Sequence, residues 1–426
     1  MYLFKLSLII FAVLFTKVVE GQEFLPGQYP DRVILTWHSD PSTSQAVTWR
    51  TDDTVQASFL EIAIADPSPN FPSNAQRMKA TTSLLEVEDV KANYHTVQIS
   101  SLLPGTMYAY RVGQKEVWSE WYQFTTAPAK DSPFSFVYFG DAQNNLKSMW
   151  SRVIRQAYSD KPKAAFMLHA GDLVNKTHSD TEWGEWHYAG SFINAMIPSI
   201  STPGNHEYDK DKKGNLELDV HWQKTFNLPL NGPKGLEETV YYLDYSNCRI
   251  ISLNSQESLQ NKKSMEAQAE WLDQVLSDSD KMWTVITLHH PIFSSKEGRD
   301  NPALRKTFKP IFDKYDVDLV LQGHDHTYGR GNNVPIGVTN TGNNTGTMYV
   351  VSVSGPKMYD LTKDKWMDRA ASNTQLYQVI SIDNNKLSFE AYTATGELYD
   401  AFDMTKTNGK RVLLERIPED VKERIK

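Results

Sequence analysis

Cysteine is almost absent from the sequence, since Cys248 is the only one among 426 residues. A single cysteine excludes an intrachain disulfide and any zinc or redox site built on several cysteine thiolates. A metal site would therefore have to use His, Asp, Asn and similar ligands. Positive charge is also scarce, because 44 Lys and Arg stand against 52 Asp and Glu and the formal net charge is −8. This balance argues against a protein that coats nucleic acid, and an anionic ligand would have to be held by local cations.

Long hydrophobic runs are missing except near the N-terminus. Residues 6–15 are almost wholly apolar, follow Lys5 and precede the small residues Val19 and Gly21. This run is too short to span a bilayer, and its flanks are typical of a signal peptide. We therefore expect residues 1–21 to be a signal peptide and the protein to be secreted or periplasmic, with no membrane span. The single cysteine favours a bacterial periplasm or surface. A buried N-terminal helix is the alternative interpretation of residues 1–21.

Residues 28–128 contain short segments in which apolar and polar residues alternate, as in Val33, Leu35 and Trp37. Alternation with a period of two predicts half-buried strands. The segment Leu102-Leu103-Pro104-Gly105-Thr106-Met107-Tyr108 resembles the fibronectin type III pattern, in which a tyrosine hydroxyl braces a corner of the sandwich. We expect one all-β sandwich here with a structural or targeting role, and the sequence identifies no partner for it.

The pattern changes between residues 132 and 404, where apolar segments alternate with amphipathic ones. We expect buried strands at 134–139, 164–169, 284–288, 317–321 and 348–353, helices at 149–158, 266–276 and 303–315, and a hairpin of strands at 377–382 and 387–392. Such alternation predicts a layered α/β domain. The remaining residues, 405–426, are a charged tail that we expect to be peripheral.

Five short segments that carry metal-binding residue types each follow a predicted strand. They are Gly140-Asp141-Ala142-Gln143, Gly171-Asp172-Leu173-Val174-Asn175, Gly204-Asn205-His206-Glu207, His289-His290-Pro291 and Gly323-His324-Asp325-His326. Functional sites of open α/β sheets form at the carboxyl ends of the strands, so these loops can converge. Each segment alone has a simpler interpretation, since Gly-Asp is usually a turn. The five together predict one metal site with Asp, Asn and His ligands.

This ordered set of motifs resembles the calcineurin-like metallophosphoesterase family. Within that family the chain is similar to purple acid phosphatases, particularly the bacterial members with an N-terminal fibronectin type III-like domain, and the likeness extends from Pro30 to about Phe402. The resemblance implies an α/β/β/α metallophosphoesterase domain with two divalent metal ions. It also implies hydrolysis of small phosphorylated substrates by a metal-activated hydroxide.

Roles carry over from the family motif to individual residues of this chain. The resemblance implies that Asp172 bridges the two metals. It implies that the first metal is held by Asp141, Asp172 and His326, and the second by Asp172, Asn205, His289 and His324. His206 would stabilise the phosphate or protonate the leaving group, while His290 would be a supporting residue.

The chain departs from the family pattern at three positions. Purple acid phosphatases have an iron-binding tyrosine three residues after the bridging Asp, where this chain has Asn175, and many other members have a His where it has Gln143. Gln143 is therefore the candidate for the remaining ligand, with Asn175 as the alternative. Without a phenolate we expect a colourless enzyme with divalent Fe, Mn or Zn. Arg299 lies near the position at which the plant enzymes carry histidines that contact substrate. It would either bind phosphate oxygens or be a solvated loop residue.

Three functions are compatible with these motifs. The first is hydrolysis of phosphate monoesters, and the second is hydrolysis of diesters or nucleotides at the same site. The third is a non-catalytic exported binding protein, against which the intact ligand set argues. The aromatic segment with Trp183, Trp186, His187 and Tyr188 would form either a wall of the substrate cleft or a buried helix face.

Overall fold

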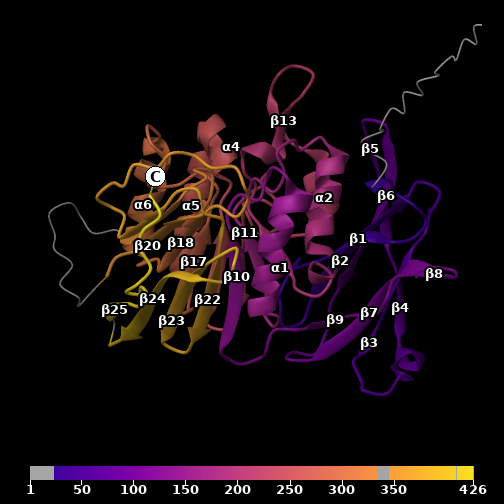
Figure 1. The fold of residues 1–426 in the computed structure, drawn as a ribbon. Coiled ribbons are helices and arrows are strands. Elements are labelled where there is room, and N and C mark those ends of the chain that lie inside the picture. The colour runs from indigo at the N-terminus through magenta and orange to yellow at the C-terminus, as the bar shows by residue number, and fades with distance from the viewer. Residues whose placement is uncertain (1–23, 333–344, 409, 426) are drawn as a thin grey trace, which may run out of the picture.

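The computed structural model describes residues 24–332, 345–408 and 410–425, so the expected signal peptide lies outside the described residues. A β-sandwich forms the N-terminal part, on the right of Figure 1, and a layered α/β domain follows it. The predicted fold class is confirmed. Among the helices of the described residues, none combines the length and the apolar character needed to cross a membrane.

The sandwich consists of two antiparallel sheets, with strand orders β1-β2-β6-β5 and β4-β3-β7-β8, and β9 pairs with β7. Its strands are β1 (Asp31–Thr36), β2 (Gln45–Asp52), β3 (Phe59–Ile64), β4 (Gln76–Lys79), β5 (Thr81–Val87), β6 (Val90–Ile99), β7 (Met107–Gln114), β8 (Val117–Trp118) and β9 (Tyr122–Thr125). Alternate residues of these strands, such as Val33 and Leu35, share one core with Tyr110. The Leu103 backbone N–H donates to the Tyr108 hydroxyl at 2.9 Å, which is the corner contact that the motif predicts.

The α/β domain contains two seven-stranded sheets. In order across the first sheet, the strands are β12 (Ser199–Ser201), β11 (Met167–His169), β10 (Phe134–Phe139), β22 (Leu376–Asp383), β23 (Lys386–Thr393), β24 (Leu398–Thr407) and β25 (Lys410–Glu415). Across the second they are β15 (Tyr241–Tyr245), β16 (Cys248–Ser252), β17 (Trp283–Thr287), β18 (Leu319–Gln322), β20 (Met348–Val351), β19 (Tyr328–Asn332) and β21 (Arg369–Ala371). A small hairpin of β13 (Tyr208–Lys210) and β14 (Leu216–Leu218) projects from the domain (Figure 1).

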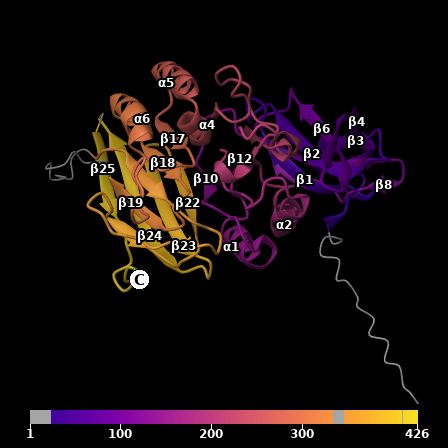
Figure 2. The ribbon, with the colours of Figure 1, turned by 90° about the horizontal axis from the view of Figure 1, so that it is seen from above.

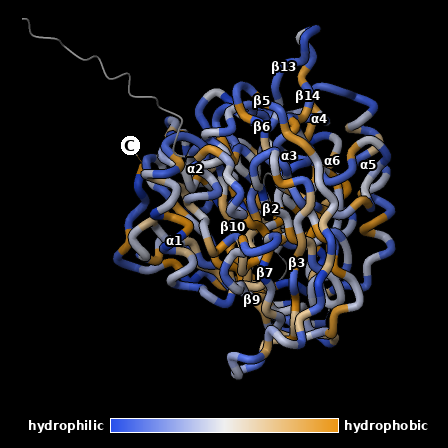
Figure 3. The backbone as a smooth tube through the Cα atoms, turned by 90° about the vertical axis from the view of Figure 1, so that its right-hand side faces the viewer, coloured by the Kyte–Doolittle hydropathy of each residue, from blue (hydrophilic) through white to orange (hydrophobic). Residues whose placement is uncertain are grey.

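The helices are α1 (Ser151–Asp160), α2 (Asp180–Gly190), α3 (Val220–Thr225), α4 (Ser255–Gln260), α5 (Lys262–Ser277) and α6 (Pro302–Lys314). Most of them lie on the outer faces of the two sheets, whereas α3 contacts β2 and β5 of the sandwich (Figures 1 and 2). The strand period of two explains the layering: Val285 of β17 packs into the core between the sheets, while its neighbour Ile286 packs with Leu272 of α5. In Figure 3 hydrophobic segments are seen around β10 of this domain and around β2 and β7 of the sandwich.

The two domains share a core. Ile34 and Trp37 of the sandwich belong to the apolar cluster of the α/β domain, and the Trp37 ring lies 5.6 Å from that of Phe166. The Tyr110 hydroxyl donates to the Ala195 carbonyl at 2.6 Å across the same boundary. The sandwich is therefore fixed against the α/β domain rather than tethered to it.

Two segments differ from their sequence-based description. Helix α2 buries Trp183 and Trp186, as the helix-face interpretation expects, but leaves Tyr188 45% exposed. The expected boundary before residue 405 falls inside β24, and residues 410–415 form β25, the outer strand of the first sheet.

Candidate metal centre

The five predicted segments converge at the carboxyl ends of strands from both sheets. Asp141 follows β10, Asp172 follows β11 and Asn205 follows β12, whereas His289 follows β17 and the loop 324–326 follows β18. Asp141 also forms a parallel bridge with Val353, which links the ends of the two sheets. This arrangement is the one expected for ligand sites of α/β sheets.

The loops hold their ligands in an unusual backbone conformation. Asp172, His324 and His326 all have positive φ, at 51°, 73° and 51°. Non-glycine residues rarely adopt this region, and such strain concentrates at functional sites. A side chain at Gly204 or Gly323 would overlap a carboxylate of the site, so glycine is required at both positions.

One group of ligand atoms surrounds His289. Its Nε2 lies 3.2 Å from Asp172 Oδ2, 3.1 Å from His324 Nδ1 and 3.3 Å from Asn205 Oδ1. Asp172, His289 and His324 together could hold a metal ion. Four N and O atoms converging on one point from four loops have the chemistry of a transition-metal site.

A second group shares Asp172 and adds Asp141 and His326. His326 Nε2 lies 3.3 Å from Asp141 Oδ2, and this carboxylate oxygen is buried with no hydrogen-bond partner among the described residues. A buried carboxylate oxygen without a donor is costly unless a cation neutralises it. Both groups therefore fit metal ions, with Asp172 common to the two.

Gln143 lies beside the second group. Its Nε2 is 2.8 Å from Asp172 Oδ2 and 3.2 Å from His326 Nε2, while its Oε1 is buried without a partner in the described part of the chain. Rotating the terminal amide by half a turn would exchange the two atoms and direct Oε1 toward the ligand group. Asn175, the alternative ligand, contacts the site through its backbone, because its carbonyl accepts a hydrogen bond from the His206 ring.

Backbone carbonyls orient the ligand imidazoles. His289 Nδ1 donates to the Ala170 carbonyl at 2.8 Å, and His326 Nδ1 donates to the Lys357 carbonyl at 2.9 Å. A carbonyl oxygen only accepts, so Nδ1 of each ring carries a proton and Nε2 is the nitrogen that faces the ligand group.

Burial and charge shift the pKa values of the carboxylates in opposite directions. Burial raises the pKa of Asp141 to about 8. Burial would also raise the pKa of Asp172, but the charge of His289 and its hydrogen bond hold that pKa well below its usual value. For His289, burial lowers the pKa, but the negative charges of Asp172 and Asp141 outweigh it and raise the pKa to about 9. The ionised carboxylate of Asp172 thus favours positive charge at this centre.

His206 and Arg299 lie next to the ligands. The His206 backbone N–H donates to Asp172 Oδ1 at 2.9 Å, and its ring Nδ1 donates to the Asn175 carbonyl at 2.6 Å. Arg299 Nη1 donates to the His324 carbonyl at 2.8 Å and to Asp325 Oδ1 at 3.0 Å. This anchoring of Arg299 to the ligand loop was foreseen by neither sequence interpretation.

Asp325 and Glu207 are adjacent to predicted ligands, but the sequence motifs give neither of them a role. Both are completely buried, and each accepts several hydrogen bonds from neighbouring loops. A Glu or Asp inside a ligand motif is the only sequence signal that could have marked them.

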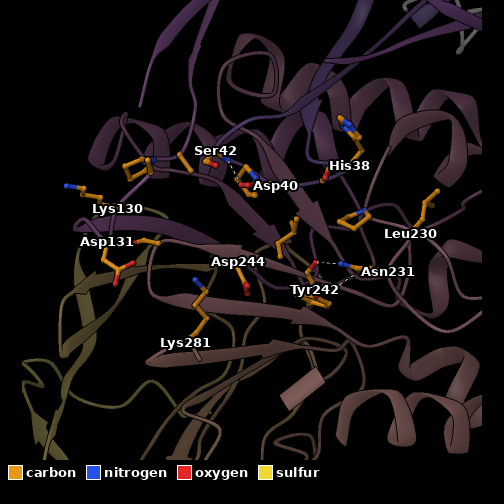
Figure 4. A pocket seen from close by; sticks show the side chains of 18 residues that line it. His38, Asp40, Ser42, Lys130, Asp131, Leu230, Asn231, Tyr242, Asp244 and Lys281 are labelled. Atoms are coloured by element: carbon orange, nitrogen blue, oxygen red, sulfur yellow. Dashed lines mark hydrogen bonds between the residues drawn. The ribbon is translucent and has the colours of Figure 1, made fainter. Parts of the chain in front are cut away.

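A separate pocket of about 610 Å³ lies at the boundary between the domains (Figure 4). His38, Asp40, Tyr242 and Lys281 are among its lining residues, and in the described part of the chain its lining includes none of the predicted site residues. The chemistry of the metal ligands, rather than the presence of a hollow, therefore locates the candidate site.

Comparison with known proteins agrees with this geometry. Residues 30–126 match the family described as purple acid phosphatase, N-terminal domain, and residues 134–328 match calcineurin-like phosphoesterase. Residues 134–328 thus carry a calcineurin-like phosphoesterase domain. The domain pair of the chain is that of purple acid phosphatases, so the predicted family is confirmed.

Individual relatives are distant. The chain is 26% identical to purple acid phosphatase 1 of Ipomoea batatas, over 63% of this chain and 58% of the relative. It is 25% identical to acid phosphatase type 7 of Homo sapiens, over 75% of this chain and 74% of the relative. The yellow lupin purple acid phosphatase PPD1 has a similar structure, with a TM-score of 0.73 at 20% identity over 89% of this chain and 75% of that chain. PhoD gives a TM-score of 0.67 at 14% identity, over 94% of both chains. The chain spans about three fifths of the length of several curated relatives that it matches.

Proposed function

We propose that this protein hydrolyses phosphate monoesters at two divalent metal ions. The observation that carries the proposal is the position of Asp172, which belongs to both groups of metal-binding side chains. A carboxylate shared by two ligand groups can hold two metal ions close together. Two such ions can stabilise the attacking and leaving oxygens of an in-line displacement.

Each metal would be held by its own set of side chains. Asp141, Gln143, Asp172 and His326 would bind the first metal, and Asp172, Asn205, His289 and His324 the second. When bound, the two ions supply Lewis acidity and a water of lowered pKa. Divalent Fe, Mn or Zn suits these N and O ligands. The name of the relative Fe(3+)-Zn(2+) purple acid phosphatase 12 of Arabidopsis thaliana includes trivalent iron, but without a tyrosine at position 175 we expect this protein to hold divalent ions and to be colourless.

His206 would act on the substrate through Nε2, because its Nδ1 is bound to the Asn175 carbonyl. A protonated Nε2 would donate to a phosphate oxygen or to the leaving group. Arg299 uses Nη1 to hold the ligand loop, so a phosphate contact would involve its other guanidinium nitrogens. The local cations would offset the negative net charge of the chain.

The proposal extends to the whole chain. Residues 1–21 would be a signal peptide for secretion or export to the periplasm. They would be followed by the sandwich at 28–128, the catalytic domain at 132–404 and the charged segment at 405–426. The substrate would be a small phosphorylated molecule.

The test combines metal analysis with hydrolysis of p-nitrophenyl phosphate and bis-p-nitrophenyl phosphate. We expect about two metals per chain, no purple absorption, faster cleavage of the monoester and loss of activity in Asp172→Ala. Asp273→Ala is the matched control, because this exposed carboxylate of α5 pairs with Lys314 of α6, outside the ligand loops. Faster cleavage of the diester would instead identify phosphate diesters as the substrate class. Folded protein with neither metal nor activity after supply of Mn, Zn and Fe would refute the proposed enzymatic function and leave a non-catalytic binding protein. This outcome is relevant because one relative is called "Probable inactive purple acid phosphatase 24".

A further inference from the structure

Helix α2 begins with a pattern whose usual contact is missing. Ser179, Asp180, Thr181 and Glu182 match the capping-box sequence, in which the Glu side chain accepts the N–H of the capping Ser. Here the Ser179 N–H donates to the Lys176 carbonyl instead, at 3.0 Å. Glu182 Oε2 accepts the backbone N–H of Asn175 at 2.7 Å and that of Lys176 at 2.9 Å. The Glu182 side chain therefore holds the loop before the helix rather than the helix itself.

The loop that Glu182 holds is the one that orients His206. The Asn175 N–H is bound by Glu182, and the Asn175 carbonyl accepts the His206 ring Nδ1–H at 2.6 Å. This carbonyl fixes both the tautomer and the direction of the imidazole. Glu182 is thus connected to His206 through one residue and does not belong to either metal-ligand group.

The sandwich supports the start of the same helix. The Asp180 side chain is only 4% exposed and pairs with two arginines of the other domain. Arg32 Nη1 lies 2.7 Å from Asp180 Oδ1 and Nη2 lies 2.8 Å from Oδ2, while Arg50 Nη1 lies 2.9 Å from Oδ2. The bidentate pairing of Arg32 with Asp180 is geometrically specific. These ion pairs of Asp180 fix the first turn of α2, which carries Glu182.

We propose that Glu182 is a positioning residue for His206, and that Arg32 and Arg50 of the sandwich extend this support across the domain boundary. The sandwich is then part of the catalytic unit and not only a targeting module. This inference rests on the proposed function, in which His206 acts on the substrate.

The experiment compares Glu182→Ala, Glu182→Gln and Glu185→Ala in the full-length, metal-loaded protein. Both hydrogen bonds use one oxygen of Glu182, so the Gln amide oxygen can replace it and we expect activity close to wild type. Glu182→Ala should lower kcat for p-nitrophenyl phosphate at least about tenfold with unchanged metal content, since a shift of about 1 Å can cost about a hundredfold. Glu185→Ala is the control on the same helix, because Glu185 accepts the Lys147 N–H and not that of Asn175.

A double-mutant cycle separates positioning from general damage. In a His206→Ala background, Glu182→Ala should change kcat less than about twofold, because two residues that act as one unit are not additive. An equal loss in both backgrounds, loss of metal with the rate, or wild-type activity of Glu182→Ala would each overturn the inference. Arg32→Lys keeps the charge but not the fork, and we expect it to reproduce the Glu182→Ala pattern more weakly.

A readout independent of activity distinguishes this inference from the proposed function. The ¹⁵N shifts of the His206 ring report which nitrogen carries the proton. We expect protonated Nδ1 in wild type and Glu182→Gln, and a mixture of tautomers in Glu182→Ala. An inactive wild type that shows this pattern would refute the proposed function and leave the positioning contact intact. Identical shifts in all three proteins would overturn the contact itself.

Discussion

Glu207 accepts the backbone N–H of Asp172 at 2.8 Å, with the carboxylate completely buried. The same carboxylate accepts the N–H groups of Leu173 at 2.8 Å and Gly204 at 2.7 Å. These three donors belong to the loops after β11 and β12. They compensate the burial of Glu207 and hold Asp172 in its left-handed conformation.

We predict that Glu207→Gln weakens metal binding although Glu207 is not a ligand. A Gln amide places an NH₂ group where the carboxylate accepts backbone N–H groups, so at least one donor loses its partner. Residues that support ligands typically change metal affinity by about 10–100-fold. Metal titration with a competing chelator measures this change, and Glu217→Gln on the exposed strand β14 is the control. Unchanged metal affinity in a folded Glu207→Gln protein would contradict the prediction.

Arg299 gives a prediction that separates support from substrate binding. Its Nη1 holds the His324 carbonyl and Asp325, and Asp325 also accepts the Ser295 N–H at 2.7 Å. We expect Arg299→Ala to lower thermal stability and metal retention while KM changes less than about threefold, because the lost contacts are to the ligand loop. Steady-state kinetics at saturating metal, together with thermal unfolding, measure both effects. A large rise in KM with normal metal retention would instead assign Arg299 to phosphate binding.

The buried ring of His169 predicts a pH dependence of stability. Both of its ring nitrogens lack a partner among the described residues, and burial lowers its pKa to about 3. Between about pH 6.5, the ordinary His value, and about pH 3, the unfolded chain binds a proton that the folded chain does not. The free energy of unfolding should therefore fall as the pH decreases through this window. We expect His169→Phe to have a flatter profile in urea unfolding between pH 4 and 7, and an unchanged slope would contradict this.

The sequence was most informative where one physical constraint dominates. Strand β10 was predicted at the bounds that the structure shows, because an apolar run interrupted only by Ser135 fits a strand that is mostly buried on both faces. The ligand loops were found because each holds Asp, Asn or His after an apolar segment, and four of the five contain a glycine directly before such a residue. Strand β12, with Ser199 and Ser201, has no apolar run and owes its pairing to β11.

Contacts between distant segments were beyond the reach of local patterns. Ser179 and Glu182 match a helix cap by sequence, but the loop that Glu182 actually binds is decided by how α2 packs on the sandwich. In the same way, a charged tail is the local interpretation of residues 405–426, although Arg411 within it is only 5% exposed. Partners for such side chains become visible only with the tertiary structure.

The C-terminal segment gives the last prediction. Asp318 is completely buried at the start of β18 and lies 2.7 Å from Arg411 Nη1 and 2.7 Å from Lys406 Nζ. Removing one member of a buried ion pair costs about 3–5 kcal/mol when the remaining charge is left uncompensated, and here Lys406 would still offset part of the charge of Asp318. We therefore expect Arg411→Met to lower the urea midpoint of the α/β domain strongly, while Lys422→Met at an exposed position does not. Adding Asp318→Leu to Arg411→Met should recover part of the loss, because the buried carboxylate that has lost Arg411 is then removed. Equal midpoints for Arg411→Met and wild type would show that residues 410–415 contribute nothing to the stability of the domain.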